Sequence, residues 1–285
     1  RELVNLDGIW GFKVDTSDAG FTQNWAQAKL SESRDIAVPA SYNDLFTENS
    51  IREHVGWVWY QRTVRVPRGW GGQRILVRAD SATHEGIIFV NGRQVASHVG
   101  GYMPFDADIT DLVSAGREFL LTIAVNNVLT NETVPPGKVV TLSDGRKQQT
   151  YLHDFFNYAG LHRSVWLYSV PESHIADVTV RTDYQGLTGL INYSTELVGD
   201  GTVVVELQDE SGAVVATGTG ASGTLRVADV KLWQPGAAYL YRLVVRAVSG
   251  TDVLDEYCVN VGVRTVKVQG NQFLINDEPF YFTGF

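Results

Sequence analysis

Residues 89–95 read "FVNGRQV", two apolar runs joined by Asn91-Gly92. Asn and Gly tolerate the positive φ that both central positions of a type I′ turn require, so this stretch predicts a tight β-hairpin. Short β-branched or aromatic runs separated by Gly, Asn and Asp recur on both sides of it, as strands do. They include residues 73–79, 118–127, 162–170 and 176–182. The pattern predicts an all-β protein.

Helical patterns are scarce in the sequence. The best candidate is "FTQNWAQAKL" (21–30), where we expect one short helix. At 285 residues the chain is long enough for roughly two domains, and Pro171 with its polar neighbours interrupts the strands at 169–178. The runs that follow, between 187 and 266, recur at the roughly 8–12-residue spacing of a β-sandwich and gather no polar cluster. We therefore interpret the second block as a structural spacer domain.

The end of the sequence predicts one more hairpin. "FLINDEPFYF" (273–282) pairs two apolar runs, with Asn276 and Asp277 at the turn. The sequence then stops at Phe285, directly after an apolar, strand-like run. A domain that ended there would leave a strand edge and an apolar face exposed. We therefore expect the sequence to be cut short.

Composition excludes several function classes. A formal charge of −9 and a pI near 5.1 argue against nucleic acid or an anionic membrane as the main partner. No apolar run approaches the roughly 20 residues of a membrane-spanning helix. The single cysteine, Cys258, excludes an internal disulfide and a cysteine-based zinc site, and its alternating surroundings predict a packed, inert thiol. Two sequons, at Asn131 and Asn192, would permit glycosylation and favour secretion slightly over an intracellular location.

The motifs of the commonest catalytic and cofactor sites are missing from the sequence. It contains no phosphate-cradling glycine loop, no zinc-type His/Glu helix and no serine on a strand-turn-helix elbow, so we predict no cofactor and no metal. Trp57, Trp59 and Tyr60 would either line a carbohydrate or fill a sandwich core, and the core is the favoured interpretation. We expect His84 and His98 at the surface or at the edge of the core.

One carboxylate stands out from this background. In "YLHDFFNYAGLHRSVWLY" (151–168), Asp154 is surrounded by Phe155, Phe156 and Tyr158. Burying it there without a partner would cost several kcal/mol. It is therefore either paired with a local arginine such as Arg163 or available to accept hydrogen bonds from a polyol ligand. The residue pattern favours neither alternative.

Several stretches resemble the amino-terminal region of the β-glucuronidases, in glycoside hydrolase family 2. "HDFFNYAG" is typical of the glucuronidase branch, whereas "FVNG" with "GGY" occurs across the wider family. The resemblance covers essentially the whole chain, and its one departure is "LWQP", where relatives often have a second Trp. The matching stretches are 6–15, 55–67, 89–110, 153–168, 232–235, 261–266 and 273–285.

The resemblance implies an architecture. We expect a jelly-roll sugar-binding domain at 1–170, an immunoglobulin-like β-sandwich at 171–266, and the first strands of a catalytic TIM barrel at 267–285. The family reaction is retaining hydrolysis of a β-D-glucuronide by two glutamates, to glucuronic acid and an aglycone. In relatives both glutamates lie in the barrel. No catalytic residue is therefore expected in this segment.

The resemblance also implies a substrate contact. In relatives the aspartate at the position of Asp154 reaches into the mouth of the barrel and binds a sugar hydroxyl, which suits a carboxylate acceptor. Neighbouring aromatic rings would exclude water and strengthen that bond. His153 is a second candidate, although alternation along an extended chain would point it away from Asp154.

The implied partners are a β-D-glucuronide substrate, the protein's own barrel domain and further copies in a homo-oligomer, with no nucleic acid and no membrane. Two alternatives remain open. One is a β-galactosidase or β-mannosidase of the same family. The other is a stand-alone carbohydrate-binding module of two sandwiches.

Overall fold

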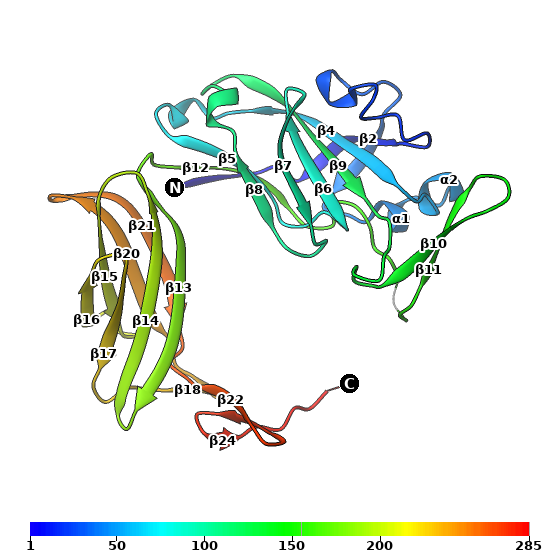
Figure 1. Ribbon diagram of the computed structural model, residues 1–285. Coiled ribbons are helices and arrows are strands. Elements are labelled where there is room, and N and C mark those ends of the chain that lie inside the picture. Colours follow the sequence, from blue (N-terminus) through cyan, green and yellow to red (C-terminus); the bar gives the residue numbers. More distant parts are fainter. Residues whose placement is uncertain (155, 285) are drawn as a thin grey trace. The chain divides into compact units, whose positions relative to one another are not determined.

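The computed structural model describes residues 1–154 and 156–284. Phe155, one of the aromatic residues beside Asp154, and Phe285 lie outside the described residues. The chain forms two compact units, residues 1–169 and 170–285, each built from antiparallel sheets (Figure 1). The all-β prediction is confirmed.

Two sheets build the core of the first unit. In the six-stranded sheet the order is β3-β2-β4-β9-β6-β7, and in the four-stranded sheet it is β1-β12-β5-β8. The strands of the larger sheet are β2 (Gly8–Val14), β3 (Arg34–Val38), β4 (Trp57–Arg65), β6 (Glu85–Val90), β7 (Arg93–Val99) and β9 (Glu118–Asn126). Those of the smaller sheet are β1 (Glu2–Asn5), β5 (Arg74–Ala79), β8 (Phe105–Asp108) and β12 (Val165–Val170).

Alternation along the strands produces the core of this unit. Tyr60 and Ile123 from the larger sheet belong to the same buried cluster as Val77 and Leu167 from the smaller one. Fully burying a side chain of this size stabilises the fold by about 1.5–3 kcal/mol relative to leaving it exposed. This cluster therefore joins the two sheets.

The aromatic residues of β4 lie in the interior. Trp59 and Tyr60 are 1% and 0% exposed, and because neighbouring residues of a strand face opposite sides, they enter different clusters. Trp59 stacks on Phe89, while Trp57 packs edge to face on Phe21. The core interpretation is confirmed for Tyr60, which belongs to the cluster between the two sheets, whereas Trp59 is buried in a second cluster on the opposite face of β4.

The hairpin predicted at "FVNGRQV" is present. Asn91 and Gly92 have φ of 49° and 83° and join β6 to β7, as a type I′ turn requires. The helix expected at 21–30 is wrong: only the 3₁₀ turn η1 (Trp25–Gln27) forms there, because Asn24 adopts φ 53° directly before it. The other short elements of the unit are α1 (Tyr42–Leu45), α2 (Asn49–Arg52), η2 (Arg68–Trp70) and η3 (Thr110–Leu112).

A separate two-stranded hairpin projects from the first unit (Figure 1). It consists of β10 (Gly137–Thr141) and β11 (Lys147–Tyr151). The chain leaves β11 directly into the segment that carries Asp154. The hairpin therefore directly precedes the predicted site in the chain.

The second unit is a sandwich of a three-stranded sheet, β13-β14-β17, and a four-stranded sheet, β16-β15-β20-β21. Ile191 from the first sheet and Val205 and Leu243 from the second share one buried cluster. The strands are β13 (His174–Gln185), β14 (Thr188–Val198), β15 (Thr202–Gln208), β16 (Val214–Thr219), β17 (Ser222–Val227), β20 (Tyr241–Ser249) and β21 (Asp252–Val261).

Cys258 differs from its prediction. It is exposed rather than packed, because Val259 and Val261 take the inward positions of β21 and leave Cys258 on the outer face. Its Sγ accepts a hydrogen bond from Arg242 at 3.1 Å.

The last strands of the second unit form the predicted hairpin. Asn276 and Asp277 have φ of 53° and 64° and connect β23 to β24. Asn276 Nδ2 donates to the carbonyl of Trp233 at 2.9 Å, which ties this hairpin to the rest of the unit. The elements here are β18 (Trp233–Gln234), β19 (Ala237–Ala238), β22 (Val266–Gln269), β23 (Gln272–Ile275) and β24 (Glu278–Pro279). In the two described ranges, no helix has the length and apolarity needed to span a membrane.

Candidate functional site

Asp154 lies in the irregular segment between β11 and β12. The chain bends at residues 152–154 instead of continuing the strand. The side chain of Asp154 is 96% exposed, so it is not enclosed by aromatic rings as the sequence suggested. The bend also brings His153 beside it: Nδ1 of His153 lies 3.0 Å from Oδ1 of Asp154. The expectation that His153 points away from Asp154 is therefore wrong.

Asp154 is not paired with Arg163 in the structure; its neighbouring base is His153. Arg163 is exposed and donates from Nη1 to the carbonyl of Tyr102 at 3.2 Å. Of the two alternatives that the sequence left open, pairing with Arg163 is thus excluded in this conformation. Asp154 presents a carboxylate to solvent, where it can accept hydrogen bonds from a ligand.

Three residues after Asp154 the chain is fixed by a buried amide. Asn157 is 1% exposed, and its Oδ1 lies 2.6 Å from Nε2 of His84. Its Nδ2 donates to the carbonyl of Asn127 at 3.1 Å, and its own carbonyl accepts from Nδ2 of Asn43 at 2.6 Å. Each of these polar groups therefore has a partner, as buried polar groups require.

Asn43 and Asn127 extend this network to other parts of the first unit. Oδ1 of Asn43 accepts from the backbone N–H of Ala159 at 3.1 Å. Oδ1 of Asn127 accepts from the N–H of Gly56 at 2.9 Å, and its Nδ2 donates to the hydroxyl of Tyr42 at 2.6 Å. Asn43 is 3% exposed and Asn127 2%. The network thus connects the Asp154 segment to α1 and to the end of β9.

His84 completes the network and differs from its prediction. It is 4% exposed rather than at the surface or the edge of the core, whereas His98 is half-buried and stacks on Phe105. Burial lowers the pKa of His84, and the hydrogen bond to Asn157 partly offsets that effect. Neutral His84 carries its proton on Nε2, because the Asn157 amide turns its oxygen toward that atom.

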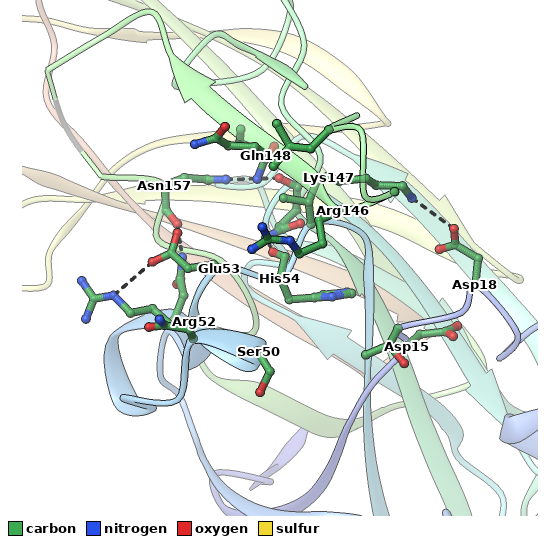
Figure 2. A pocket seen from close by; sticks show the side chains of 18 of the residues that line it. Asp15, Asp18, Ser50, Arg52, Glu53, His54, Arg146, Lys147, Gln148 and Asn157 are labelled. Carbon is green, nitrogen blue, oxygen red and sulfur yellow. Dashed lines mark hydrogen bonds and ion pairs between the residues drawn. The ribbon is translucent and has the colours of Figure 1, made fainter. Parts of the chain in front are cut away.

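A polar pocket of about 930 Å³ lies beside the same segment, with Asn157 and Tyr151 on its wall (Figure 2). Its other walls come from the loop after β2, from α2 and the residues that follow it, and from the β10–β11 hairpin. Labelled lining residues include Asp15, Asp18, Ser50, Arg52, Glu53, His54, Arg146, Lys147 and Gln148.

Six of the seven charged groups of the pocket are paired with one another. Lys147 Nζ lies 3.1 Å from Asp18 Oδ2, which bridges β11 and the loop after β2. Arg146 pairs with Asp144 at 2.7 Å, and Arg52 lies 3.5 Å from Glu53. The seventh group, Asp15, is buried and accepts from the backbone N–H groups of Ala19 and Gly20 at 2.8 Å. Burial lowers the pKa of His54 in the same wall, so its imidazole stays neutral at pH 7.

The described ranges contain no cluster of three or more His, Cys, Asp or Glu side chains that could hold a metal ion.

Sequence reasoning did not find the buried network. Asn157 stands within "HDFFNYAG", yet no spacing rule connects it with Asn43 and Asn127, which lie 114 and 30 residues away along the chain. The only sequence signal for the network was an amide side chain in an apolar stretch that does not read as a turn.

Comparison with known proteins places these features in a family. Residues 3–171 match the family model described as "Glycosyl hydrolases family 2, sugar binding domain", which is more than half of the chain. Residues 168–264 match "Glycosyl hydrolases family 2". The chain belongs to glycosyl hydrolase family 2. The family resemblance seen in the sequence is therefore confirmed.

Within family 2, the chain is similar to curated β-glucuronidases. The chain is 48% identical to the β-glucuronidase of Paenibacillus borealis, over 100% of this chain and 49% of that protein. It is 43% identical to the human β-glucuronidase, over 100% of this chain and 48% of that protein. The chain thus spans about half the length of the curated relatives it matches.

Solved structures of a β-glucuronidase are also similar to this chain. A crystal structure of Ruminococcus gnavus β-glucuronidase superposes with a TM-score of 0.94 at 36% identity, over 100% of this chain and 48% of that one. A second structure of that enzyme, in complex with D-glucuronic acid, gives a TM-score of 0.93 at 36% identity, over 100% of this chain and 50% of that one.

Proposed function

We propose that this chain is the amino-terminal part of a retaining β-glucuronidase, which hydrolyses β-D-glucuronides to glucuronic acid and an aglycone. The observation that carries the proposal is the full-length match of this chain to β-glucuronidases at up to 48% identity. The complex of the Ruminococcus gnavus enzyme with D-glucuronic acid supports the substrate class. The relatives are about twice as long as this chain. The family resemblance places the two catalytic glutamates in the barrel, so we assign them to the part of the enzyme outside these residues.

The segment contributes a substrate contact through Asp154. An ionised carboxylate accepts short, charge-assisted hydrogen bonds from sugar hydroxyls, and Asp154 is 96% exposed and able to do so. His153, 3.0 Å away, is the second binding residue, because it can orient the carboxylate or donate to the same sugar. Neither residue breaks the glycosidic bond. Their contribution is to bind and orient the sugar.

The remaining partners follow from the same proposal. A TIM barrel that begins at 267–285 would supply the catalytic residues, and the complete enzyme would assemble as a homo-oligomer. The jelly-roll domain at 1–170 and the immunoglobulin-like domain at 171–266 would support that barrel.

The test is substrate preference of the full-length enzyme. We expect kcat/KM for p-nitrophenyl β-D-glucuronide to exceed the values for the corresponding β-galactoside and β-mannoside. A preference for the galactoside or the mannoside would overturn the proposed specificity while leaving the family intact. Glycan binding without hydrolysis of any of the three substrates would favour a stand-alone binding module.

A further inference from the structure

We propose that Asn157 is a positioning residue that sets the direction of the Asp154 carboxylate. It acts through a buried cluster, the amide clamp, which consists of Asn43, His84, Asn127 and Asn157. The inference rests on the proposed function, because it takes Asp154 as the residue that contacts the substrate. Asn157 is not itself a substrate ligand, since its side chain is buried and its polar atoms bond to protein groups.

The hydrogen bonds of the amide clamp allow one orientation of Asn157. Its Oδ1 accepts from His84 Nε2, and its Nδ2 donates to the carbonyl of Asn127. Turning the amide over would place its oxygen against the carbonyl of Asn127, and the two acceptors would repel each other. The Asn127 carbonyl would also lose its donor, and a buried polar group has no water to replace a lost partner. Asn157 therefore fixes both the place and the rotation of its stretch of backbone.

The chain on the other side of Asp154 is also held. The N–H of Leu152 donates to the carbonyl of Pro136 at 2.8 Å, at the base of the β10–β11 hairpin. Asp154 thus lies between two fixed points, two residues from one and three from the other. Three residues span at most about 11 Å, so the carboxylate cannot move far from the amide clamp.

Hydrogen bonds also hold the residues that follow Asn157. The amide clamp therefore marks the beginning of a stretch of chain that is fixed to the rest of the first unit. Ala159 donates to Asn43 and its carbonyl accepts from the N–H of Tyr42 at 3.2 Å. The carbonyl of Gly160 accepts from the N–H of Thr83, also at 3.2 Å. Residues 157–160 are therefore held in place when the first unit folds, so substrate binding does not have to order them.

Two roles for Asn157 make different predictions. If it only stabilises the first unit, its loss lowers activity to the same degree whether or not Asp154 is present. If it positions Asp154, its loss has little effect once the carboxylate is gone. A double-mutant cycle separates these cases, because it measures how far two effects depend on each other.

The experiment uses the full-length enzyme with p-nitrophenyl β-D-glucuronide. Four proteins are compared: the wild type, Asp154→Asn, Asn157→Ala and the double variant. We expect Asn157→Ala to lower kcat/KM about tenfold or more in the wild-type background, since small misplacements of a binding group are costly. In the Asp154→Asn background the same change should lower kcat/KM less than about twofold.

A matched control comes from another buried amide of the first unit. Gln61 is 6% exposed, and it accepts from the N–H of Leu30 at 2.8 Å and donates to the carbonyl of Ala28 at 3.0 Å. Gln61→Ala should lower the melting temperature. Its effect on kcat/KM should be the same with and without the Asp154→Asn change.

A second variant covers the case in which Asn157→Ala does not fold. His84→Ala keeps the three amide side chains of the clamp but removes the ring nitrogen that bonds to Asn157 Oδ1. It should show the same dependence on Asp154 at smaller amplitude.

The outcomes distinguish the two proposals. Unchanged kcat/KM in Asp154→Asn would overturn the substrate contact and, with it, the amide clamp's role. If Asp154→Asn is impaired but the clamp variants lose equal activity in both backgrounds, the positioning role is overturned and the substrate contact stands. Loss confined to the background that retains Asp154 supports the inference.

Discussion

At the residue scale, the site combines an exposed charge with a buried neutral amide. Asp154 is 96% exposed and Asn157 is 1% exposed, although only two residues separate them in the chain. An exposed carboxylate can reach a ligand but has little to hold it in place, whereas a buried amide with all its partners is fixed. The pairing of the two gives an accessible acceptor on a fixed backbone.

The exposure of Asp154 makes its substitution a clean test of substrate contact. We expect Asp154→Ala to lower kcat/KM of the full-length enzyme by about 30- to 1,000-fold, by analogy with the loss of a charged hydrogen bond to the transition state. The melting temperature should stay within about 1 °C of the wild type, because surface substitutions rarely change stability. Unchanged kcat/KM, or a lower melting temperature without kinetic loss, would assign Asp154 a structural role instead.

The sequence identified Asp154 but not its surroundings. The residue pattern left an ion pair and a ligand contact equally open, and the family resemblance favoured the contact. Asn157, three residues after Asp154, is held by hydrogen bonds to residues far away in the chain, such as Asn43 at 114 positions. No local pattern carries that information.

At the scale of elements, the β10–β11 hairpin stands apart from the two larger sheets of the first unit. A two-stranded sheet alone is marginally stable in water, so it depends on contacts to the rest of the unit. Two of these contacts involve side chains of β11: Gln149 Oε1 accepts from the N–H of Leu129 at 2.7 Å, and Lys147 pairs with Asp18 at 3.1 Å. The hairpin leads directly into the Asp154 segment, so its stability matters for the site.

These two contacts should contribute unequally. Gln149→Ala leaves a partly buried N–H without its partner, and we expect it to lower the free energy of unfolding by about 1–2 kcal/mol. Lys147→Ala removes an exposed ion pair, worth about 0–1 kcal/mol. Urea unfolding measures both, and hydrogen exchange should show faster exchange in 137–151 for Gln149→Ala. A larger loss in Lys147→Ala than in Gln149→Ala would contradict this ranking.

Elements defined by local turn chemistry were predictable from the sequence, and the expected helix was not. Asn91-Gly92 and Asn276-Asp277 both form the predicted turns. A tight turn requires positive φ, and these residue types tolerate it, so the local sequence is enough to predict the turn. At 21–30 the apolar spacing suggested a helix, but Trp25 instead packs on Trp59 of β4. A tertiary contact thus overrode a weak local preference.

At the scale of the whole molecule, the first unit contains three histidines that folding keeps neutral. Burial lowers the pKa of His54, His84 and His162, and the nearby Arg163 lowers that of His162 further. Two of them contact the Asp154 region: His84 belongs to the amide clamp and His54 lines the adjacent pocket. Stability of this unit and geometry of its site therefore depend on the same protonation states.

The sign of the pH dependence follows from these shifts. The unfolded chain takes up protons at histidine near pH 6.5, whereas the folded unit resists protonation until a lower pH. The stabilisation is thus fully present above about pH 6.5 and is lost as the pH falls below that value.

Urea unfolding at pH 7, 6 and 5 should show a free energy of unfolding that decreases steadily. Carboxylates with lowered pKa, such as Asp108, titrate below this window and do not contribute. His54→Gln should flatten the profile, because one of the three groups no longer titrates. A free energy that is constant or rises between pH 7 and pH 5 would show that these histidines are not held neutral by the fold.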